Sequence, residues 1–144
     1  MLITRWIDYG SRIMVLLGLN PDQWTSAREL SSACDITRPA ALRLIRQLAQ
    51  ADLIKTRRGP GGGVKLLKET SEVTFLDIML ATDKRRGVNP CLTGDFQCNR
   101  QQFCAARQRL QPLQVTIDDF FKNLTLKQLV DDQRVLDQKQ NQSR

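Results

Sequence analysis

The sequence LIKTRRGPGGGVKLLK, residues 53–68, decides the fold. Two short runs in which apolar and polar residues alternate, 53–58 and 64–68, flank the glycine-rich segment 59–63. Such runs around a turn rich in Gly and Pro predict a β-hairpin, here with a basic tip. The turn is not a phosphate-binding loop, because it lacks the Gly-Lys-Ser/Thr ending and does not lead from a strand into a helix.

Two short helices are predicted directly before this hairpin. The tetrapeptide Ser26-Ala27-Arg28-Glu29 is a capping box, which begins the first helix. After a break at 35–36, Thr37 is the expected cap of a second helix that runs to about Asp52, with Pro39 tolerated in its first turn. Two helices joined by a short turn form a helix-turn-helix pattern, and a hairpin directly after the second helix is a wing.

The spacing of the second helix of this pair predicts which side chains face the core. We expect an inward face of Leu42, Ile45 and Leu48, with Ala41, Leu44 and Ala49 beside them. Arg38, Arg43, Arg46 and Gln47 are then left for the opposite face. A run of Arg on one helix face is often only solvated surface, but together with the basic wing it favours DNA binding.

Helical periodicity also predicts the remaining elements. Residues 2–19 form an amphipathic helix in which Asp8 and Arg12 are an i,i+4 pair, and 74–81 form a short helix. After Cys104, apolar residues at steps of three and four predict a long helix whose stripe suits a second copy of the chain. Pro112 predicts that this helix kinks or begins again near Gln111.

These elements define the expected fold class and its parts. The chain is predicted to be mainly α, a winged helix-turn-helix with a small β-hairpin wing and a long C-terminal dimerisation helix. The expected parts are a DNA-binding domain at 1–82, a cysteine loop at 83–104, a dimerisation helix and C-terminal helix at 105–137, and a disordered tail at 138–144.

The charge of the chain lies in its first half. Residues 1–68 contain 11 Lys and Arg and 5 Asp and Glu, and thus hold +6 of the total net charge of +7. This excess predicts a polyanionic partner there. No uninterrupted apolar run is long enough for a signal peptide or a membrane span, so we expect a cytoplasmic protein that has no membrane partner.

Three of the four cysteines, Cys91, Cys98 and Cys104, lie in one short segment, with six and then five residues between them. In a reducing compartment, clustered thiols of this kind are metal ligands or redox groups, and thiolates on a loop suit an iron–sulfur cluster or zinc. Zinc sites more often use Cys pairs two to four residues apart, which this segment lacks. We expect Cys34 to be a small buried apolar residue.

In these motifs the chain resembles a family of bacterial dimeric winged-helix repressors that carry an iron–sulfur cluster, including NsrR, IscR and RirA. The resemblance covers residues 1–136. The opening at Asp8-Tyr9-Gly10-Ser11-Arg12 and the closing segment at 124–130 look most like members of the nitric-oxide-sensing NsrR type, whereas the wing motif at 57–63 is shared across the family.

The resemblance implies that Cys91, Cys98 and Cys104 ligate a [4Fe-4S] or [2Fe-2S] cluster at a dimer interface. In NsrR-like members an Asp on the first helix of the other subunit is the fourth ligand, and Asp8 matches it; Arg12 matches an Arg close to the cluster. IscR-like members use a His where this chain has Arg107, and the chain has no His. Its first Cys interval is one residue longer than is common in the family, which leaves Asp95 and Cys34 open as fourth ligands.

The expected function is therefore repression of transcription by a dimer on a palindromic double-stranded DNA site, with nitric oxide as the signal. The residues expected at the DNA are Ser26, Arg28, Thr37, Arg38, Arg43, Arg46, Arg57, Arg58, Gly59 and Gly61. Two alternatives are a sensor of iron or of iron–sulfur status and a metal-free repressor with redox-active thiols. An enzyme is not expected, because the chain has neither a Cys-x-x-Cys pair nor a His for acid–base chemistry.

Overall fold

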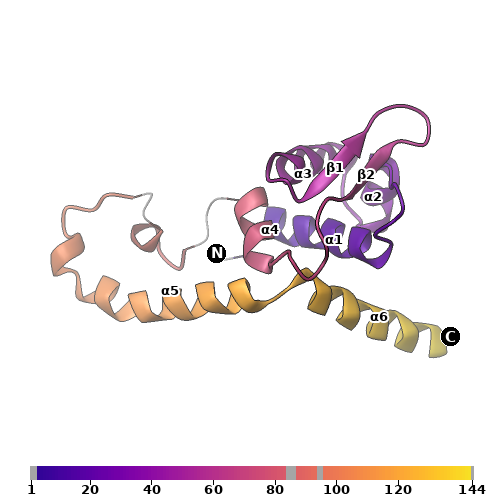
Figure 1. The fold of residues 1–144 in the computed structure, drawn as a ribbon. Helices are drawn as coiled ribbons and strands as arrows, with labels where there is room; N and C mark the ends of the chain where they lie inside the picture. The colour runs from indigo at the N-terminus through magenta and orange to yellow at the C-terminus, as the bar shows by residue number, and fades with distance from the viewer. Residues whose placement is uncertain (1–2, 84–86, 94–95, 144) are drawn as a thin grey trace.

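Local sequence signals set most element boundaries in the computed structural model, which describes residues 3–83, 87–93 and 96–143 (Figure 1). The elements in order are α1 (Arg5–Leu19), α2 (Ala27–Ala33), α3 (Arg38–Gln50), β1 (Ile54–Arg57), β2 (Gly63–Leu66), α4 (Phe75–Thr82), the short 3-10 helices η1 (Pro90–Leu92) and η2 (Gln101–Phe103), α5 (Ala105–Asn123) and α6 (Leu126–Gln142). Helices α1 to α4, the β-hairpin and α6 pack together as a domain, from which the N-terminal half of α5 and the cysteine segment (residues 87–93 and 96–104) extend as an arm (Figure 1). The predicted fold class is confirmed.

Caps define both helices of the helix-turn-helix. Ser26 Oγ accepts the Glu29 N–H and the Glu29 carboxylate accepts the Ser26 N–H at 2.7 Å, so the predicted capping box is present. Hydrogen bonds from Ser26 to the Glu29 carboxylate, first from the backbone N–H and then from the hydroxyl, lower the pKa of this carboxyl. Thr37 caps α3 by accepting the Ala40 N–H. The chain therefore enters each helix at the residue that its sequence predicts.

The wing is an antiparallel hairpin in which Ile54 pairs with Leu66 and Arg57 with Gly63. The turn needs glycine, because the φ angles of Gly59 and Gly61 are +90° and +69°. Thr25, just before α2, exchanges two backbone hydrogen bonds with Val64, at 3.0 and 2.8 Å. The base of the wing is therefore joined to the start of α2.

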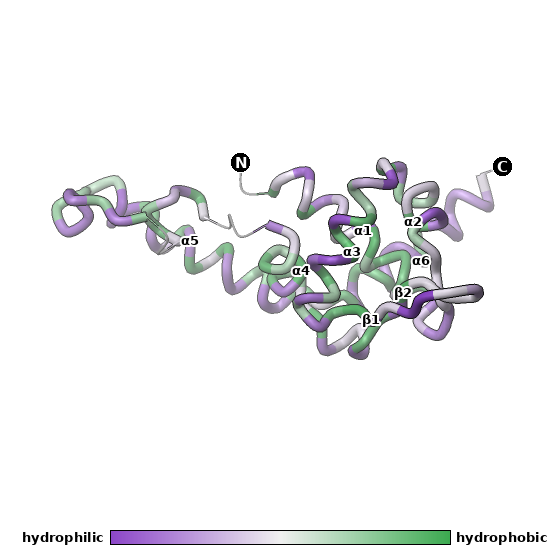
Figure 2. The backbone as a smooth tube through the Cα atoms, turned by 90° about the horizontal axis from the view of Figure 1, so that it is seen from above, coloured by the Kyte–Doolittle hydropathy of each residue, from purple (hydrophilic) through white to green (hydrophobic). Residues whose placement is uncertain are grey.

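Helix α1 lies at the centre of the domain and contacts α2, α3, α4, α6 and β2. Its inward residues Ile13, Met14 and Leu17 are almost fully buried in the main core. Figure 2 shows α1 among the other helices of the domain. Two glycines allow close crossings: a Cβ at Gly10 would lie 2.4 Å from a methyl of Thr82 in α4, and one at Gly18 would lie 2.5 Å from a methyl of Val130 in α6. The packing of α1 therefore fixes the positions of α4 and α6.

Helix α5 is continuous from Ala105 to Asn123 with Pro112 inside it, so the predicted restart near Gln111 does not occur. Its C-terminal end is fixed to the domain by a second small core, where the rings of Phe121 and Phe75 stack at 5.0 Å. The N-terminal half extends beyond the domain, with the cysteine segment alongside it (Figure 1).

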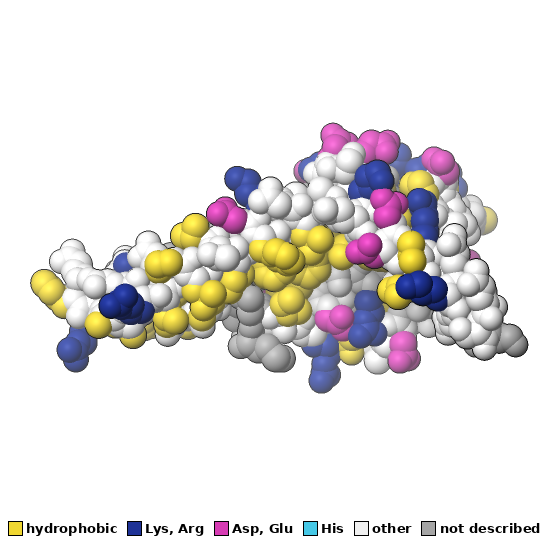
Figure 3. Space-filling view, turned by 90° about the horizontal axis from the view of Figure 1, so that it is seen from below, with side chains coloured by type: hydrophobic (Ala, Val, Ile, Leu, Met, Phe, Trp, Pro, Cys, Tyr) yellow, Lys and Arg dark blue, Asp and Glu magenta, His cyan; other side chains and the backbone are white. Residues whose placement is uncertain are grey.

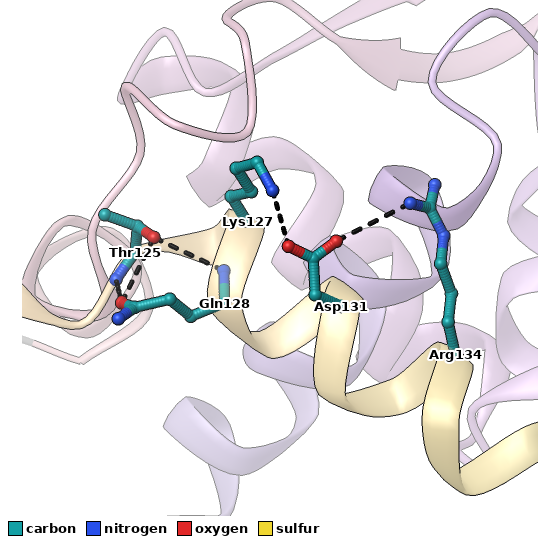
Figure 4. A network of polar contacts seen from close by, with 5 residues as sticks. All are labelled: Thr125, Lys127, Gln128, Asp131 and Arg134. Atoms are coloured by element: carbon teal, nitrogen blue, oxygen red, sulfur yellow. Dashed lines mark hydrogen bonds and ion pairs between the residues drawn. The ribbon is translucent and has the colours of Figure 1, made fainter.

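Backbone hydrogen bonds hold the junction between α5 and α6 on the domain. The Phe75 N–H donates to the Leu124 carbonyl and the Leu126 N–H donates to the Val73 carbonyl, both at 2.7 Å. A capping box of Thr125 and Gln128 then begins α6, and Asp131 pairs with Lys127 and Arg134 along its surface (Figure 4).

Four sequence-based expectations differ from the structure. Helix α1 begins at Arg5, and Leu2 lies outside the described residues. Leu42, expected in the core, is 50% exposed, because the buried face of α3 is formed by Ala41, Leu44, Ile45 and Leu48. Gln47, expected outside, is half-buried, and its side-chain amide donates to the Thr82 carbonyl. Helix α6 extends to Gln142, past the position where a disordered tail was expected.

None of the helices described here combines the length and the apolar character that crossing a membrane requires.

Candidate DNA-binding face and cysteine segment

The face of α3 that points away from the core is basic and exposed. Helical geometry puts Arg38, Leu42 and Arg46 on one stripe, at successive steps of four residues, opposite the buried stripe. Pro39, Arg43 and Gln50 border it, and all six side chains are exposed. This helix is the second of a helix-turn-helix, and its outer face is not covered by the rest of the described chain. It therefore has the shape and charge to enter a DNA major groove.

Arg43 has a specific partner within the protein. Its guanidinium carbon lies 3.8 Å from the centre of the Trp6 ring on α1. A guanidinium stacked on Trp at this distance is held by a cation–π interaction, worth about 0.5–2 kcal/mol. Arg43 therefore joins α3 to the first turn of α1, a role that the sequence did not indicate.

Arg57 is also held within the protein. Its guanidinium lies 4.3 Å from the centre of the Trp24 ring and donates a hydrogen bond to the Gly61 carbonyl across the turn. These contacts fix the shape of the wing where β1 enters the turn. Arg58, Gly59 and Gly61 are exposed at the tip, where a groove or a phosphate could approach them.

The remaining residues expected at the DNA lie at helix starts. The side chains of Ser26 and Thr37 serve as caps of α2 and α3. Arg28 is exposed in the first turn of α2. The residues predicted to contact DNA therefore lie on or next to α2, α3 and the wing. Among them, Ser26 and Thr37 also cap helices.

The three clustered cysteines lie in the arm. Cys91 is in η1, Cys98 lies before η2, and Cys104 is the residue before α5; all three are half-buried and free of disulfides. The segment is tied to α5 by Gln114, whose buried side-chain oxygen accepts the Val88 N–H at 2.8 Å. Arg107, from the first turns of α5, donates to the Cys91 carbonyl. Helix α5 therefore holds the segment near its own first turns.

The donor chemistry of this segment fits an iron–sulfur cluster, because its free thiols are the soft ligands that such clusters use. The single chain, however, does not assemble a closed site: within residues 3–83, 87–93 and 96–143 no group of three or more Cys, Asp or Glu side chains could hold a metal ion. Asp95, one alternative ligand, lies outside the described residues.

Asp8 lies on α1, in the domain, whereas the cysteines of the same chain lie in the arm (Figure 1). Its carboxylate forms an ion pair with Arg12 at 2.7 Å, and both side chains are nearly half exposed. They line an open hollow of about 570 Å³ together with Tyr9 and Asp35. The predicted ion pair of Asp8 and Arg12 is thus present, and a second protein chain could reach it from solvent.

Cys34, the other alternative ligand, is at the C-terminal end of α2 and only 6% exposed. Burial raises the pKa of its thiol, and the nearby Arg12 guanidinium opposes this shift in part. Arg12 also donates a hydrogen bond to the Cys34 carbonyl at 3.3 Å. Cys34 packs in the main core with Leu30 and Ile45, as a small apolar residue does.

We expect Cys34 to be the least reactive thiol of the reduced, metal-free protein. Alkylation requires an accessible thiolate, and burial with a raised pKa denies Cys34 both. At pH 8, Cys91, Cys98 and Cys104 should react with iodoacetamide at least about 10-fold faster, as followed by mass spectrometry of peptides. In denaturant all four rates should converge, and equal rates in the folded protein would contradict the prediction.

Several large apolar side chains on the arm are exposed to solvent. Figure 3 shows hydrophobic side chains along the arm that continue beneath the domain. Leu113 and Phe120, two turns apart on one face of α5, are 47% and 62% exposed; Phe103, just before the helix, is 83% exposed, and Val115, on another face, is 54% exposed. A stripe of this size on a helix that leaves its domain is typical of a surface that a second protein covers.

Sequence reasoning missed Trp6, Trp24 and Leu42 as residues of the DNA-binding face. Both Trp contacts join residues that lie far apart in sequence, so no local pattern indicated them. For Leu42, the apolar residues at 41, 42, 44, 45 and 48 fit two adjacent stripes, so the sequence alone did not show that residue 42 lies outside.

Comparison with known proteins identifies the kind of protein. A family model matches residues 3–132; the family is Rrf2, whose description is iron-dependent transcriptional regulator. A protein of Aquifex aeolicus (strain VF5), named as an HTH-type transcriptional regulator, is 26% identical over 132 residues, 90% of this chain and 92% of its own.

Solved structures share the fold at low identity. CymR (YrzC), the global cysteine regulator of B. subtilis, superposes with a TM-score of 0.75 at 21% identity, over 91% of this chain and 97% of its own. IscR of T. potens has a TM-score of 0.74 at 20% identity, over 92% and 88%.

Proposed function

Because the chain belongs to the Rrf2 family of transcriptional regulators, we propose that it is a homodimeric repressor whose affinity for a palindromic DNA site is controlled by an iron–sulfur cluster that reacts with nitric oxide. The observation that carries the DNA-binding part is the exposed stripe of α3, with Arg38 and Arg46 on either side of Leu42, beside a basic wing. The proposal divides the chain into a domain that reads DNA and an arm that senses.

In this proposal the recognition helices of two subunits enter successive major grooves. Arg38 and Arg46 contact bases and phosphates, while Arg58 and the tip glycines contact the flanking backbone. Arg43 and Arg57 contribute charge from fixed positions, because each is stacked on a Trp ring. The Trp contacts thus orient α3 and the wing before DNA arrives.

Dimerisation through α5 is supported by its apolar stripe, since the arm offers few side chains of its own chain to cover Leu113 and Phe120. Two arms packed against each other would bury this stripe on both copies. They would also bring the cysteine segment of one subunit toward the domain of the other.

Cys91, Cys98 and Cys104 would hold the cluster, and Asp8 of the partner subunit would be the fourth ligand. When bound, the cluster supplies iron that reacts with nitric oxide and exchanges ligands. The open hollow around Asp8 supports this role, because its carboxylate is nearly half exposed and its ion pair with Arg12 is a weak surface contact.

Helix α1 would then transmit the state of Asp8 to the DNA-binding face. Trp6 lies two residues before Asp8 and contacts Arg43 of α3, so a shift of the first turn of α1 reaches the recognition helix through one side-chain contact. A coupling of about 1–3 kcal/mol between the two sites corresponds to a 5- to 150-fold change in DNA affinity.

We expect the Asp8→Ala variant to keep most of its iron but to lose the response of DNA binding to nitric oxide. The reason is that three thiols still hold the cluster while α1 is no longer connected to the partner's segment. The measurement is the ratio of DNA dissociation constants with and without nitric oxide, together with iron content. An equal ratio in wild type and variant would refute the role of Asp8. The control variant is Asp22→Ala, which removes an exposed acidic side chain before α2.

The experiment that tests the proposal is purification without oxygen, followed by iron and sulfide analysis, visible absorbance and DNA-binding titration. Coloured protein whose DNA affinity changes with nitric oxide supports the proposal. Coloured protein that releases DNA only when iron is chelated supports the alternative, a sensor of iron or of cluster supply. The variant Cys98→Ser should lose the cluster in both cases.

A metal-free thiol sensor is the second candidate. The favouring observation is that the described part of one chain holds three half-buried free thiols but no ready metal-binding group. Colourless, iron-free protein that binds its DNA site normally, and releases it on oxidation of Cys91, Cys98 or Cys104, would establish this candidate instead.

A further inference from the structure

The centre of the exposed stripe of α3 is an aliphatic side chain. Leu42 is 50% exposed, while the core beneath α3 is already filled by Ala41, Leu44, Ile45 and Leu48. Nothing in the packing of the domain therefore requires Leu at position 42. A polar residue would have served equally well on a surface whose only task was solubility.

The neighbours of Leu42 define what kind of partner can cover it. Arg38 and Arg46 lie one turn before and one turn after it on the same stripe, and both are exposed. An apolar protein partner would have to bury these two charges next to Leu42, which is costly. A DNA major groove accepts both, since phosphates and guanine edges bind Arg while thymine offers an apolar group.

We propose that Leu42 is a specificity-determining residue that contacts the C5 methyl group of a thymine in each half of the DNA site. The inference rests on the proposed function and deepens it, since it states what the centre of the recognition helix reads. The thymine methyl is the one apolar group that standard base pairs present in the major groove. Its contact with Leu42 removes two apolar surfaces from water at once.

The position of Leu42 within α3 suits this contact. Leu42 lies in the second turn of the helix, close to the capped N-terminal end that enters the groove in helix-turn-helix proteins. Arg43 directly follows Leu42, and its side chain stacks on Trp6 of α1. This contact helps to hold α3 in one orientation about its own axis. Leu42 is therefore held toward the groove floor between two Arg side chains that can reach base edges or phosphates.

The test uses a DNA duplex selected from a random library by the purified dimer, in which each thymine of a half-site is replaced singly by deoxyuridine. This replacement removes only the methyl group. For wild type we expect one position per half-site at which affinity falls about 3- to 5-fold, the amount expected for one buried methyl. The Leu42→Ala variant should bind the unsubstituted duplex more weakly than wild type does, and replacing the thymine at that position by deoxyuridine should no longer lower its affinity.

Two further variants serve as controls. Leu42→Met keeps an apolar side chain of similar volume and should keep the deoxyuridine effect. Leu67→Ala removes a leucine that is 47% exposed, just after β2, and should leave the effect unchanged. Circular dichroism checks that the fold of each variant is intact.

The outcomes separate the inference from the proposed function. Failure to select any specific duplex would refute the proposed function itself. Specific binding with no deoxyuridine-sensitive thymine, or with the same sensitivity in wild type and Leu42→Ala, would refute the role of Leu42 alone. An altered oligomeric state of Leu42→Ala with unchanged DNA affinity would assign Leu42 to a protein contact and would also overturn the inference.

Discussion

The Phe121→Ala variant should lose about 3–5 kcal/mol of its free energy of unfolding, the usual cost of removing a buried aromatic side chain. Phe121 is 8% exposed, and its ring stacks on Phe75 at 5.0 Å in the small core that also holds Ile7 and Met79. Chemical denaturation followed by circular dichroism measures the loss. Because this core fixes α5 to the domain, the arm should also become more accessible to proteases in the variant.

The matched control is the neighbouring residue. Phe120 is 62% exposed on the outer side of the same helix. The Phe120→Ala variant should lower the unfolding free energy of the isolated subunit by only about 0.5–1.5 kcal/mol, since it removes the edge contact of Phe120 with the Phe121 ring, but it should raise the dimer dissociation constant, measured by sedimentation. Equal destabilisation by both substitutions, or an unchanged dimer in Phe120→Ala, would contradict the assignment of one Phe to the core and the other to the dimer surface.

Reversal of two charges on α3 should have the largest effect on DNA binding. In the double variant Arg38→Glu/Arg46→Glu we expect specific affinity to fall by at least about 100-fold, since each Arg at a base or phosphate accounts for roughly 1–3 kcal/mol. The slope of log affinity against log salt concentration should also decrease by about one for each phosphate contact that is lost. Fluorescence anisotropy at several salt concentrations measures both quantities.

A variant with the same change in net charge controls for long-range electrostatics. Arg134→Glu/Lys139→Glu reverses two exposed charges on α6, where Arg134 makes only a surface ion pair with Asp131. Its affinity should decrease far less, and its salt slope should stay close to that of wild type. A similar loss in both double variants would mean that total charge, and not the face of α3, determines binding.

Elements with local signals could be predicted well from the sequence. The capping box at Ser26 and the glycine-rich turn after Arg58 are each defined within a few residues, and the structure has both. The Asp8–Arg12 pair, one helical turn apart, is present for the same reason.

What could not be predicted depends on contacts between distant parts of the chain. Arg43 stacks on Trp6 and Arg57 stacks on Trp24, and neither pair has a sequence pattern. The inward face of α3 was misjudged at Leu42, because apolar residues at 41, 42, 44, 45 and 48 fit two adjacent stripes and only the neighbouring helices decide between them. Any approach of the cysteines to Asp8 of another subunit is likewise beyond the reach of one chain's periodicity.

The junction that holds the arm on the domain has an evolutionary consequence. Beside the aromatic core of Phe75 and Phe121, it contains main-chain hydrogen bonds between Phe75 and Leu124, Leu126 and Val73, and Lys127 and Thr70. Main-chain bonds of this kind constrain side-chain identity only weakly. Over evolutionary time Lys127, exposed at this junction, should therefore vary more freely than Phe75 or Phe121, whose side chains form the core there.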